Sequence, residues 1–351
     1  MNKVIANIKF HACRWAGRLG ALCVLIAFAT SCNMVNEDLE ACPQGIAVRF
    51  VYDYNMERAN AFHSQVDCVT LYIFDQSWHL VEKFTESSDV LADETYRMNI
   101  DLPAGNYHFL ALGGSTCERN SFDVANLNSR DTRAGLSMRL PLDANKISNK
   151  RLHDLFYGET EQIYVPKDKI TEITIYMMKD TNSVQIALQE LEAPYSVDIN
   201  DYEFFLEADN ELLASDNSTV STGGMLYKPH TAENRVSGYV SSMGSVVDPD
   251  ESQLVQTGVA EFHISRIMLE NSDYSYIVVV KKDSGEELIR VPMIDYMVMS
   301  RHSGHEWIQS DQEYLDRQST WNFMFFLQNG KWFQARVAVN NWILRFNNAH
   351  I

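Results

Sequence analysis

The sequence has little positive charge and only one long apolar stretch. Against 47 Asp and Glu residues stand 29 Lys and Arg, so the formal net charge is −18 and the isoelectric point is near 4.9. Proteins that bind nucleic acid need clustered Lys and Arg to neutralise phosphates. The apolar run, Leu19 to Ala29, is shorter than the roughly 20 residues that a helix needs to cross a bilayer. We therefore expect neither a nucleic-acid partner nor an integral membrane protein.

The composition is otherwise that of a globular protein. Hydrophobic residues make up 46% of the chain and charged residues 22%, values far from those of a disordered chain. At about 150 residues per domain, a chain of 351 residues predicts two domains, each able to bury its own core.

The first 31 residues have the composition of a secretory signal. They hold no Asp or Glu. The basic residues ahead of the apolar run are Lys3, Lys9, Arg14 and Arg18. A charged start, a short apolar stretch and small residues before a cleavage point are the parts of an export signal. We therefore predict that residues 1–31 are a signal peptide.

Cys32 directly follows this signal and makes the prediction more specific. Ala29-Thr30-Ser31-Cys32 resembles a bacterial lipobox, with Ala29 at a position where Leu is usual. We interpret Cys32 as the lipidation site and residues 32–42 as a lipidated tether, polar and acidic over residues 33–38. Two or more acyl chains make such an anchor stable. The alternative is an ordinary signal peptide with a cysteine nearby by chance.

The other cysteines do not form a closed framework. Two of the six lie in the signal, and Cys32 is assigned to lipid. The remaining three are Cys42, Cys68 and Cys117. An odd number allows at most one disulfide, and the sequence does not select the pair. The spacings of 26 (68 − 42) and 49 (117 − 68) fit no zinc pattern.

Beyond the tether, short stretches of alternating apolar and polar residues recur with turn residues between them. In the first half they are 47–52, 69–74, 80–84, 96–102, 107–112 and 173–178. In the second half they are 183–188, 202–207, 259–264, 274–281, 322–327, 332–339 and 342–346. Many short strands, few helical signals and no alternation of strands with helices predict an all-β fold. Residues 69–74 are apolar on both faces, which predicts a central strand.

Several local signals refine this prediction. Pro103-Ala104-Gly105-Asn106 predicts a tight turn with Gly105 at a positive φ. Asn329-Gly330 predicts a type I′ hairpin turn. Ser310 with Glu313 predicts a capping box before a short helix. Residues 209–250 are rich in Ser, Asn and Asp and predict long loops.

A polar break at residues 179–182 is the predicted boundary between two β-sandwich domains. The sequence there is Lys179-Asp180-Thr181-Asn182, between two strand-like stretches. The predicted domains are an N-terminal sandwich of residues 43–180 and a C-terminal sandwich of residues 181–351.

No group of residues indicates catalysis. Residues 302–306 (His-Ser-Gly-His-Glu) offer two imidazoles and a carboxylate, but Ser303-Gly304 breaks the local helix that would aim them at one zinc ion. Residues 248–251 (Asp-Pro-Asp-Glu) are interpreted as a solvated loop, with weak calcium binding as the minor alternative. No spacing among the acidic residues selects a catalytic pair. We therefore expect no enzyme activity, no metal site and no cofactor.

Tryptophans leave one binding alternative open. Those beyond the signal are Trp78, Trp307, Trp321, Trp332 and Trp342. Exposed indole faces suit sugar rings, whereas tryptophans in strands more commonly pack the core. A row of tryptophans on one solvent-facing surface would favour a glycan ligand, and an exposed hydrophobic sheet edge would favour a strand partner.

The strand residues also carry a family pattern. The segments concerned are residues 42–46, 48–55, 66–67, 69–75, 102–107, 155–158, 323–327, 329–332 and 341–345. Together, in this order and spacing, they resemble the fimbrium-anchoring subunit lipoproteins of Bacteroidales. The resemblance spans nearly the whole mature chain and is weakest between Ala193 and Glu251.

The resemblance implies two tandem transthyretin-like β-sandwich domains, held to the outer membrane by lipidated Cys32. It also implies that the chain fastens the base of a fimbrium to the cell, limits fibre length and contacts a stalk subunit by β-strand complementation. Residues 342–351 are a candidate for donation to that subunit; the alternative is a last strand paired within its own domain. The competing function is a surface lipoprotein of similar fold that binds glycan or host protein.

Overall fold

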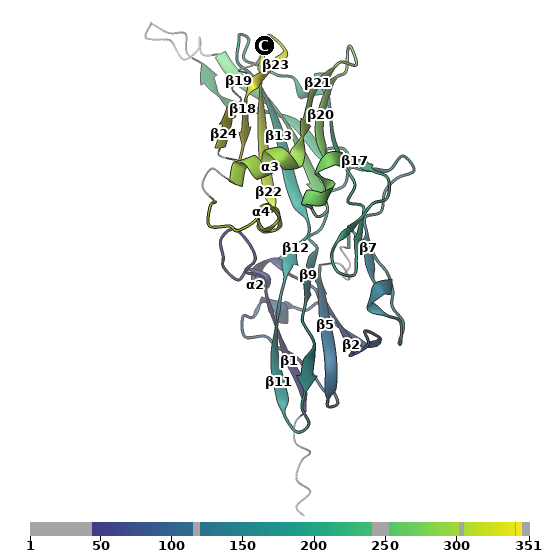
Figure 1. Cartoon of the computed structure of the whole chain (residues 1–351). Coiled ribbons are helices and arrows are strands. Elements are labelled where there is room, and N and C mark those ends of the chain that lie inside the picture. Colours follow the sequence, from purple (N-terminus) through teal and green to yellow (C-terminus); the bar gives the residue numbers. More distant parts are fainter. Residues whose placement is uncertain (1–43, 115–119, 241–252, 302–304, 341, 346–351) are drawn as a thin grey trace, which may run out of the picture.

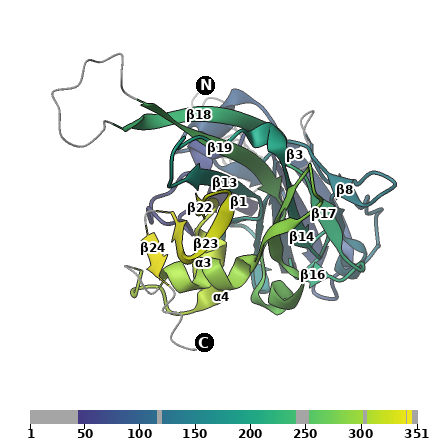
Figure 2. The ribbon, with the colours of Figure 1, turned by 90° about the horizontal axis from the view of Figure 1, so that it is seen from above.

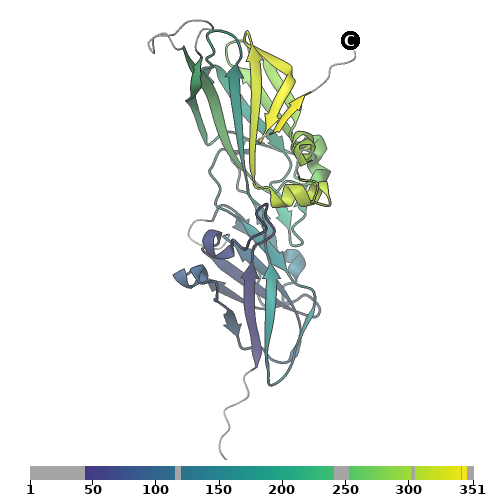
Figure 3. The same cartoon turned by 90° about the vertical axis from the view of Figure 1, so that its left-hand side faces the viewer.

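The computed structural model describes residues 44–114, 120–240, 253–301, 305–340 and 342–345. These residues form an elongated molecule of two lobes stacked end to end (Figures 1 and 3). We call the lobe in which the described chain begins the first lobe, and the other the second lobe. Regular structure in the described chain is mainly strand, arranged in five sheets. The predicted all-β sandwich fold is confirmed.

Two sheets form the first lobe. Their strands are β1 (Gly45–Val51), β2 (Val69–Asp75), β3 (Leu80–Glu86), β4 (Met98–Ile100), β5 (Gly105–Gly113), β9 (Phe156–Glu159), β10 (Ile163–Val165), β11 (Ile170–Tyr176) and β12 (Met178–Lys179). One sheet has the order β11-β1-β4, and the other has the order β12-β9-β5-β2-β3 with β10 beside β5. A hydrophobic core that includes Val48, Phe50, Leu71 and Phe109 fills the space between them.

The prediction that residues 69–74 form a central strand is confirmed. β2 lies between β5 and β3, and all six residues from Val69 to Phe74 are buried. Leu71 and Ile73 face the core of the first lobe, whereas Tyr72 and Phe74 belong to a second core that continues into the other lobe.

The turn predicted at residues 103–106 is wrong in its geometry. β4 pairs with β1, and β5 pairs with β2, so this segment carries the chain from one sheet to the other. Gly105 is the first residue of β5 and is not among the described glycines with a positive φ. A crossing between sheets needs no reversal of direction within two residues, and the left-handed conformation is not required there.

Two sheets also form the second lobe. Their strands are β8 (Ile147–Ser148), β13 (Asn182–Glu190), β14 (Tyr202–Ala208), β17 (Met225–Tyr227), β18 (Thr231–Val240), β19 (Gln253–Ile264), β20 (Tyr276–Lys281), β21 (Glu287–Pro292), β22 (Thr320–Gln328), β23 (Lys331–Val339) and β24 (Trp342–Arg345). One sheet has the order β18-β19-β13-β22-β23-β24 and the other β21-β20-β14-β17-β8. Their facing sides, with Ile186 and Phe323 on one and Leu206 and Ile277 on the other, share one core.

The predicted hairpin between β22 and β23 is confirmed. Asn329 and Gly330 both have a positive φ, 53° and 71°, as a type I′ turn requires. The carboxylate of Glu190 on neighbouring β13 fixes this turn, since it accepts hydrogen bonds from the backbone N–H groups of Asn329 (3.0 Å) and Gly330 (2.8 Å). The same carboxylate accepts from the N–H of Glu192 at 3.0 Å.

Helices are short and few in the described chain. The α-helices are α2 (Phe62–Gln65), α3 (Met293–Arg301) and α4 (Asp311–Arg317). The predicted cap of α4 is confirmed, because the Ser310 hydroxyl accepts the N–H of Glu313 at 3.1 Å. α3, which was not predicted, contacts β20 and β21 of one sheet and β23 and β24 of the other, so it closes one side of the second lobe (Figure 2).

A smaller sheet connects the lobes. Its strands are β6 (Asp123–Val124), β7 (Ser137–Arg139), β15 (Leu212–Ala214) and β16 (Thr219–Val220), in the order β16-β15-β7-β6. The prediction of long loops over residues 209–250 is therefore wrong for residues 212–240, which contain β15 to β18. Pairing with distant segments, such as β7 for β15 and β19 for β18, supplies the order that the polar composition of these residues does not indicate.

The polar break at residues 179–182 is buried rather than exposed. Asp180, Thr181 and Asn182 are all at most 5% exposed. Strands from residues 120–150 also pair across the break, β7 with β15 and β8 with β17. The domain limits 43–180 and 181–351 stay a prediction.

None of the helices in the described part of the chain has the length and apolar character that a membrane span requires.

Candidate functional site

A groove lies on the outer face of the five-stranded sheet of the second lobe. Strand register places Tyr276, Glu207, Leu226 and Ile147 directly opposite one another across β20, β14, β17 and β8. Residues directly opposite in a sheet share a face. The alternate residues of these strands, including Leu206, are buried in the core, so this row faces outward. The groove encloses about 500 Å³.

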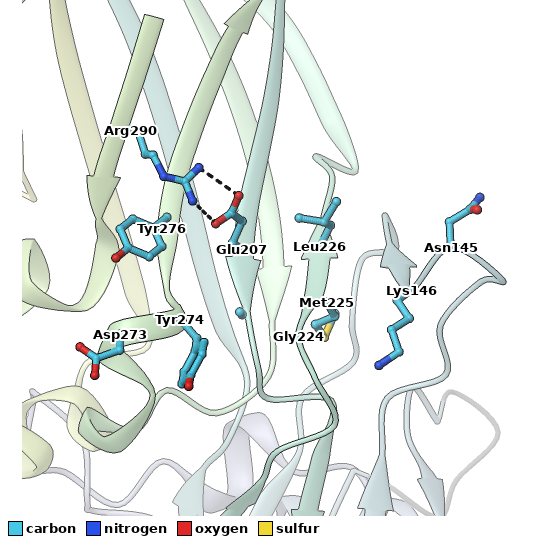
Figure 4. A pocket seen from close by; sticks show the side chains of 11 residues that line it. Asn145, Lys146, Glu207, Gly224, Met225, Leu226, Asp273, Tyr274, Tyr276 and Arg290 are labelled. Atoms are coloured by element: carbon cyan, nitrogen blue, oxygen red, sulfur yellow. Dashed lines mark hydrogen bonds and ion pairs between the residues drawn. The ribbon is translucent and has the colours of Figure 1, made fainter. Parts of the chain in front are cut away.

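Charged and aromatic side chains line this groove (Figure 4). The Arg290 guanidinium binds Glu207 through two hydrogen bonds of 2.6 and 3.1 Å, and its carbon lies 4.6 Å from the ring centroid of Tyr276. Tyr274 stands beside them and is 64% exposed. On the other side, Lys146 donates to the carbonyl of Thr222 at 2.6 Å.

A buried charge cluster lies at the junction of the lobes. Asp180 is fully buried, and its carboxylate accepts from the Asn217 amide at 2.9 Å. Arg266 lies between Asp180, at 3.9 Å, and Asp316, at 3.2 Å, and donates to the Asn217 carbonyl. Burial raises the pKa of Asp180 to about 7 against the opposing effect of Arg266, and burial also raises the pKa of Asp316. The second carboxylate oxygen of Asp180 has no hydrogen-bond partner among the described residues.

Cation–π contacts join the lobes beside this cluster. Arg317 of α4 lies over the ring of Tyr54, which follows β1 in the first lobe, with its guanidinium carbon 4.0 Å from the ring centroid. Trp307 of the second lobe lies near both Arg317 (5.7 Å) and Arg58 of the first lobe (5.1 Å). Such contacts contribute about 0.5–1 kcal/mol at exposed sites and about 2 kcal/mol when desolvated.

The long sheet of the second lobe presents two edges within the described residues. β18 is one edge, with Val236 57% exposed. β24 is the other edge and pairs with β23 from Arg336↔Arg345 to Val339↔Trp342. Residues 342–345 are thus paired within their own sheet, and residues 346–351 lie outside the described residues.

Most residues singled out in the sequence lie outside the groove and outside the buried charge cluster. Cys32 and the whole of residues 1–43 are outside the described residues, as are residues 248–251 and 302–304 of the two metal candidates. Cys68 is disulfide-bonded, and every other cysteine lies outside the described residues. His305 stacks on Tyr314 with ring centroids 5.4 Å apart. In the described parts of the chain, no group of three or more His, Cys, Asp or Glu residues is arranged to hold a metal ion.

The tryptophans that the structure describes do not form a row on one surface. Trp321 is fully buried, and Trp332 packs against Phe325 of β22 with the two ring planes nearly perpendicular. Trp78 stacks on His108 in the first lobe, and Trp307 is 42% exposed at the junction. The side chain of Trp342 lies outside what the structure describes.

The groove was missed in the sequence because its side chains come from five separate segments of the chain. The one local signal was the pair of tyrosines at positions 274 and 276.

A family model decides what kind of protein this is. The model of fimbrillin-A associated anchor proteins Mfa1 and Mfa2 matches residues 39–348, nearly nine-tenths of the chain. The chain belongs to this family. The resemblance found in the sequence is confirmed, and the chain is a fimbria-associated protein of the cell surface with an anchor-like or adhesin-like role.

Solved structures agree with this family. A candidate adhesin from Bacteroides thetaiotaomicron is 34% identical, with 88% of this chain and 100% of that one covered and a TM-score of 0.79. A candidate polysaccharide-binding protein from the same species is 31% identical, covers 87% and 99% of the two chains and has a TM-score of 0.74. The fimbrial anchor protein Mfa2 from Porphyromonas gingivalis shares the fold, at 17% identity, coverage of 87% and 99% and a TM-score of 0.64. None of the curated proteins matches the sequence.

Proposed function

We propose that this chain is a non-enzymatic outer-membrane lipoprotein that anchors the base of a fimbrium to the cell through lipid on Cys32. The observation that carries the proposal is the anchor-family match over residues 39–348, which spans both lobes. The lipobox-like residues 29–32 supply the means of attachment.

The shape of the molecule suits an anchor. β1, the first strand of the described chain, begins at the free end of the first lobe, and β24 lies in the second lobe (Figures 1 and 3). Cys32 precedes Gln44 by 12 residues, which span at most about 40 Å when fully extended. Lipid on Cys32 would therefore keep the first lobe near the membrane and leave the second lobe for a fimbrial partner.

We place the contact with the stalk subunit at the edge formed by β24 and the residues that follow it. In strand addition, main-chain hydrogen bonds give affinity and alternating side chains give specificity. β24 is a four-residue edge strand held on one side by β23 in the described chain. The free side of an edge strand presents unpaired N–H and C=O groups, to which a further strand can bind.

The test of the anchor is a comparison of cell-bound and released fimbriae in wild type and Cys32→Ala. We expect fibres of the variant to be shed into the medium with this protein at their base. Cys23→Ala is the matched control, because it removes a cysteine of the predicted signal and leaves the lipidation site, so fibres should stay attached. Fibres that remain on the cell while only the Cys32→Ala protein is mislocalised would contradict the proposal.

We also propose that the anchor limits fibre length, as the family resemblance implies. Electron microscopy of the fimbriae released by cells that lack the protein should then show longer fibres than those of wild type. An unchanged length distribution would leave attachment as its sole contribution to the fibre.

A further inference from the structure

The groove on the outer face of the five-stranded sheet has the size and form of a ligand site. Its volume of about 500 Å³ falls within the range of small-molecule and cofactor sites, roughly 300–1,000 Å³. It is built on β14, β17, β20 and β21, four strands of one hydrogen-bonded sheet. Paired strands hold Glu207, Tyr276 and Arg290 in fixed positions. Tyr274 ends the 3-10 helix Leu269–Tyr274, and Lys146 directly precedes β8.

The aromatic side chains of the groove are placed for stacking. Tyr274 is 64% exposed, although an exposed ring of this size gains by leaving water. Tyr276 lies two residues along the chain, and the Arg290 guanidinium covers part of its ring. In Figure 4 both rings stand on the same side of Glu207. The exposed ring of Tyr274 offers an apolar face with a hydroxyl attached, which suits the C–H face and hydroxyls of a sugar, whereas the ring of Tyr276 is already partly covered by Arg290.

The charges of the groove select among ligands of this kind. Lys146 and Arg290 carry positive charge, and Glu207 and Asp273 carry negative charge. Arg290 and Glu207 already neutralise each other through two hydrogen bonds. Because Glu287 also binds Arg290, at 3.3 Å, the groove has no excess positive charge that would attract an anion. Ammonium, guanidinium and carboxylate groups still donate to and accept from hydroxyls.

We propose that this groove is a binding site for a neutral oligosaccharide. One sugar ring stacks on Tyr274, and its neighbours extend across Glu207 and Leu226 toward Lys146. Their hydroxyls bond to the polar side chains along this path. The site does not depend on lipid at Cys32 or on the stalk contact, so it stands or falls separately from the anchor function.

The test uses the full chain in a detergent without a sugar headgroup, on an array of neutral and acidic glycans that includes mannohexaose, cellohexaose and trigalacturonic acid. We expect binding to neutral glycans. In calorimetry with the best neutral glycan, Tyr274→Ala should weaken the affinity at least about tenfold, or 1.4 kcal/mol. Tyr164→Ala is the matched control, because Tyr164 is 61% exposed in the first lobe and should leave the affinity unchanged.

Three outcomes would overturn the proposal. One is the absence of binding to every neutral glycan on the array. Another is binding of acidic glycans alone. The third is an affinity of Tyr274→Ala that equals that of Tyr164→Ala, whether both are unchanged or both are lowered, with both variants folded by circular dichroism, because the ligand would then lie outside the groove.

Discussion

The guanidinium carbon of Arg317 lies 4.0 Å from the ring centroid of Tyr54, and this contact ties a helix of the second lobe to the chain that leaves the first strand of the first lobe. Arg317 is held in place by Glu313, which accepts from its Nε at 2.8 Å. Burial raises the pKa of the Tyr54 hydroxyl, so the ring is neutral at physiological pH. The lobes therefore meet through a fixed pair and not only through the linking strands.

A double-mutant cycle measures this link. We expect Tyr54→Leu and Arg317→Met to be coupled by about 1 kcal/mol in the free energy of unfolding, because either change alone removes the cation–π contact. Urea denaturation of the two single variants and the double variant gives the coupling. Tyr54→Leu combined with Arg133→Met, whose guanidinium lies over Trp78 instead, should be additive. Additivity in the first pair would show that the contact does not join the lobes energetically.

The buried carboxylate of Asp180 predicts a dependence of stability on pH. Its pKa rises from the ordinary 3.8 to about 7 on folding, so the folded state binds a proton that the unfolded state does not hold. The contribution of Asp180 to the stability of the folded state is therefore complete below about pH 3.8 and is lost as the pH rises through about 7. Asp180→Asn removes this effect. The difference in Tm, variant minus wild type, should therefore be larger at about pH 8 than at about pH 5.

Asp198 provides the control for this experiment. It is exposed, and hydrogen bonds from Asn200 and Asn234 lower its pKa. It therefore stays ionised in both states between about pH 5 and pH 8. The Tm difference for Asp198→Asn should be constant over this range. A difference for Asp180→Asn that is equally constant would mean that Asp180 stays charged in its buried site.

Glu190 is predicted to stabilise the β22–β23 turn. Glu190 is 7% exposed, and its carboxylate accepts three backbone N–H groups. Hydrogen bonds to a charged group contribute about 1.5–3 kcal/mol each in mutational series, so Glu190→Ala should lower the free energy of unfolding by about 2 kcal/mol or more. Urea denaturation checks this. Glu192→Ala, which removes one exposed bond to Gln328, should change it by about 0.5 kcal/mol at most.

Truncation after residue 341 tests the proposed contact with the stalk subunit. β24 is an edge strand, so the rest of the sheet should stay folded without residues 342–351. We expect fibres to detach from cells that carry the truncated protein, while its Tm stays close to that of wild type. The matched variant is truncated after residue 345, so that it keeps β24 and lacks only residues 346–351. Loss of the fold on removal of residues 342–351 would exclude donation of this stretch.

Local patterns predicted the elements that local chemistry determines. The conformation of the Asn329-Gly330 turn and the cap of α4 by Ser310 are each determined by residues that are close in sequence, and both predictions were correct. β18 was missed because its polar residues, such as Glu233 and Asn234, are ordered by pairing with β19. Neither Asp180 nor the groove was predictable, because each depends on segments brought together from distant parts of the sequence. Lipidation of Cys32 rests on the sequence alone.

The position of β1 has a mechanical consequence. β1 lies in the middle of its sheet, parallel to β11 on one side and antiparallel to β4 on the other, and it runs along the long axis of the molecule (Figure 3). A tensile load applied at Gln44 and resisted in the second lobe would pull β1 along its own axis. Its hydrogen bonds to β11 and β4 would then be sheared together rather than broken one after another. In the proposed anchor, where β1 is the strand nearest the membrane, it is thus oriented to withstand drag on whatever is attached at the far end.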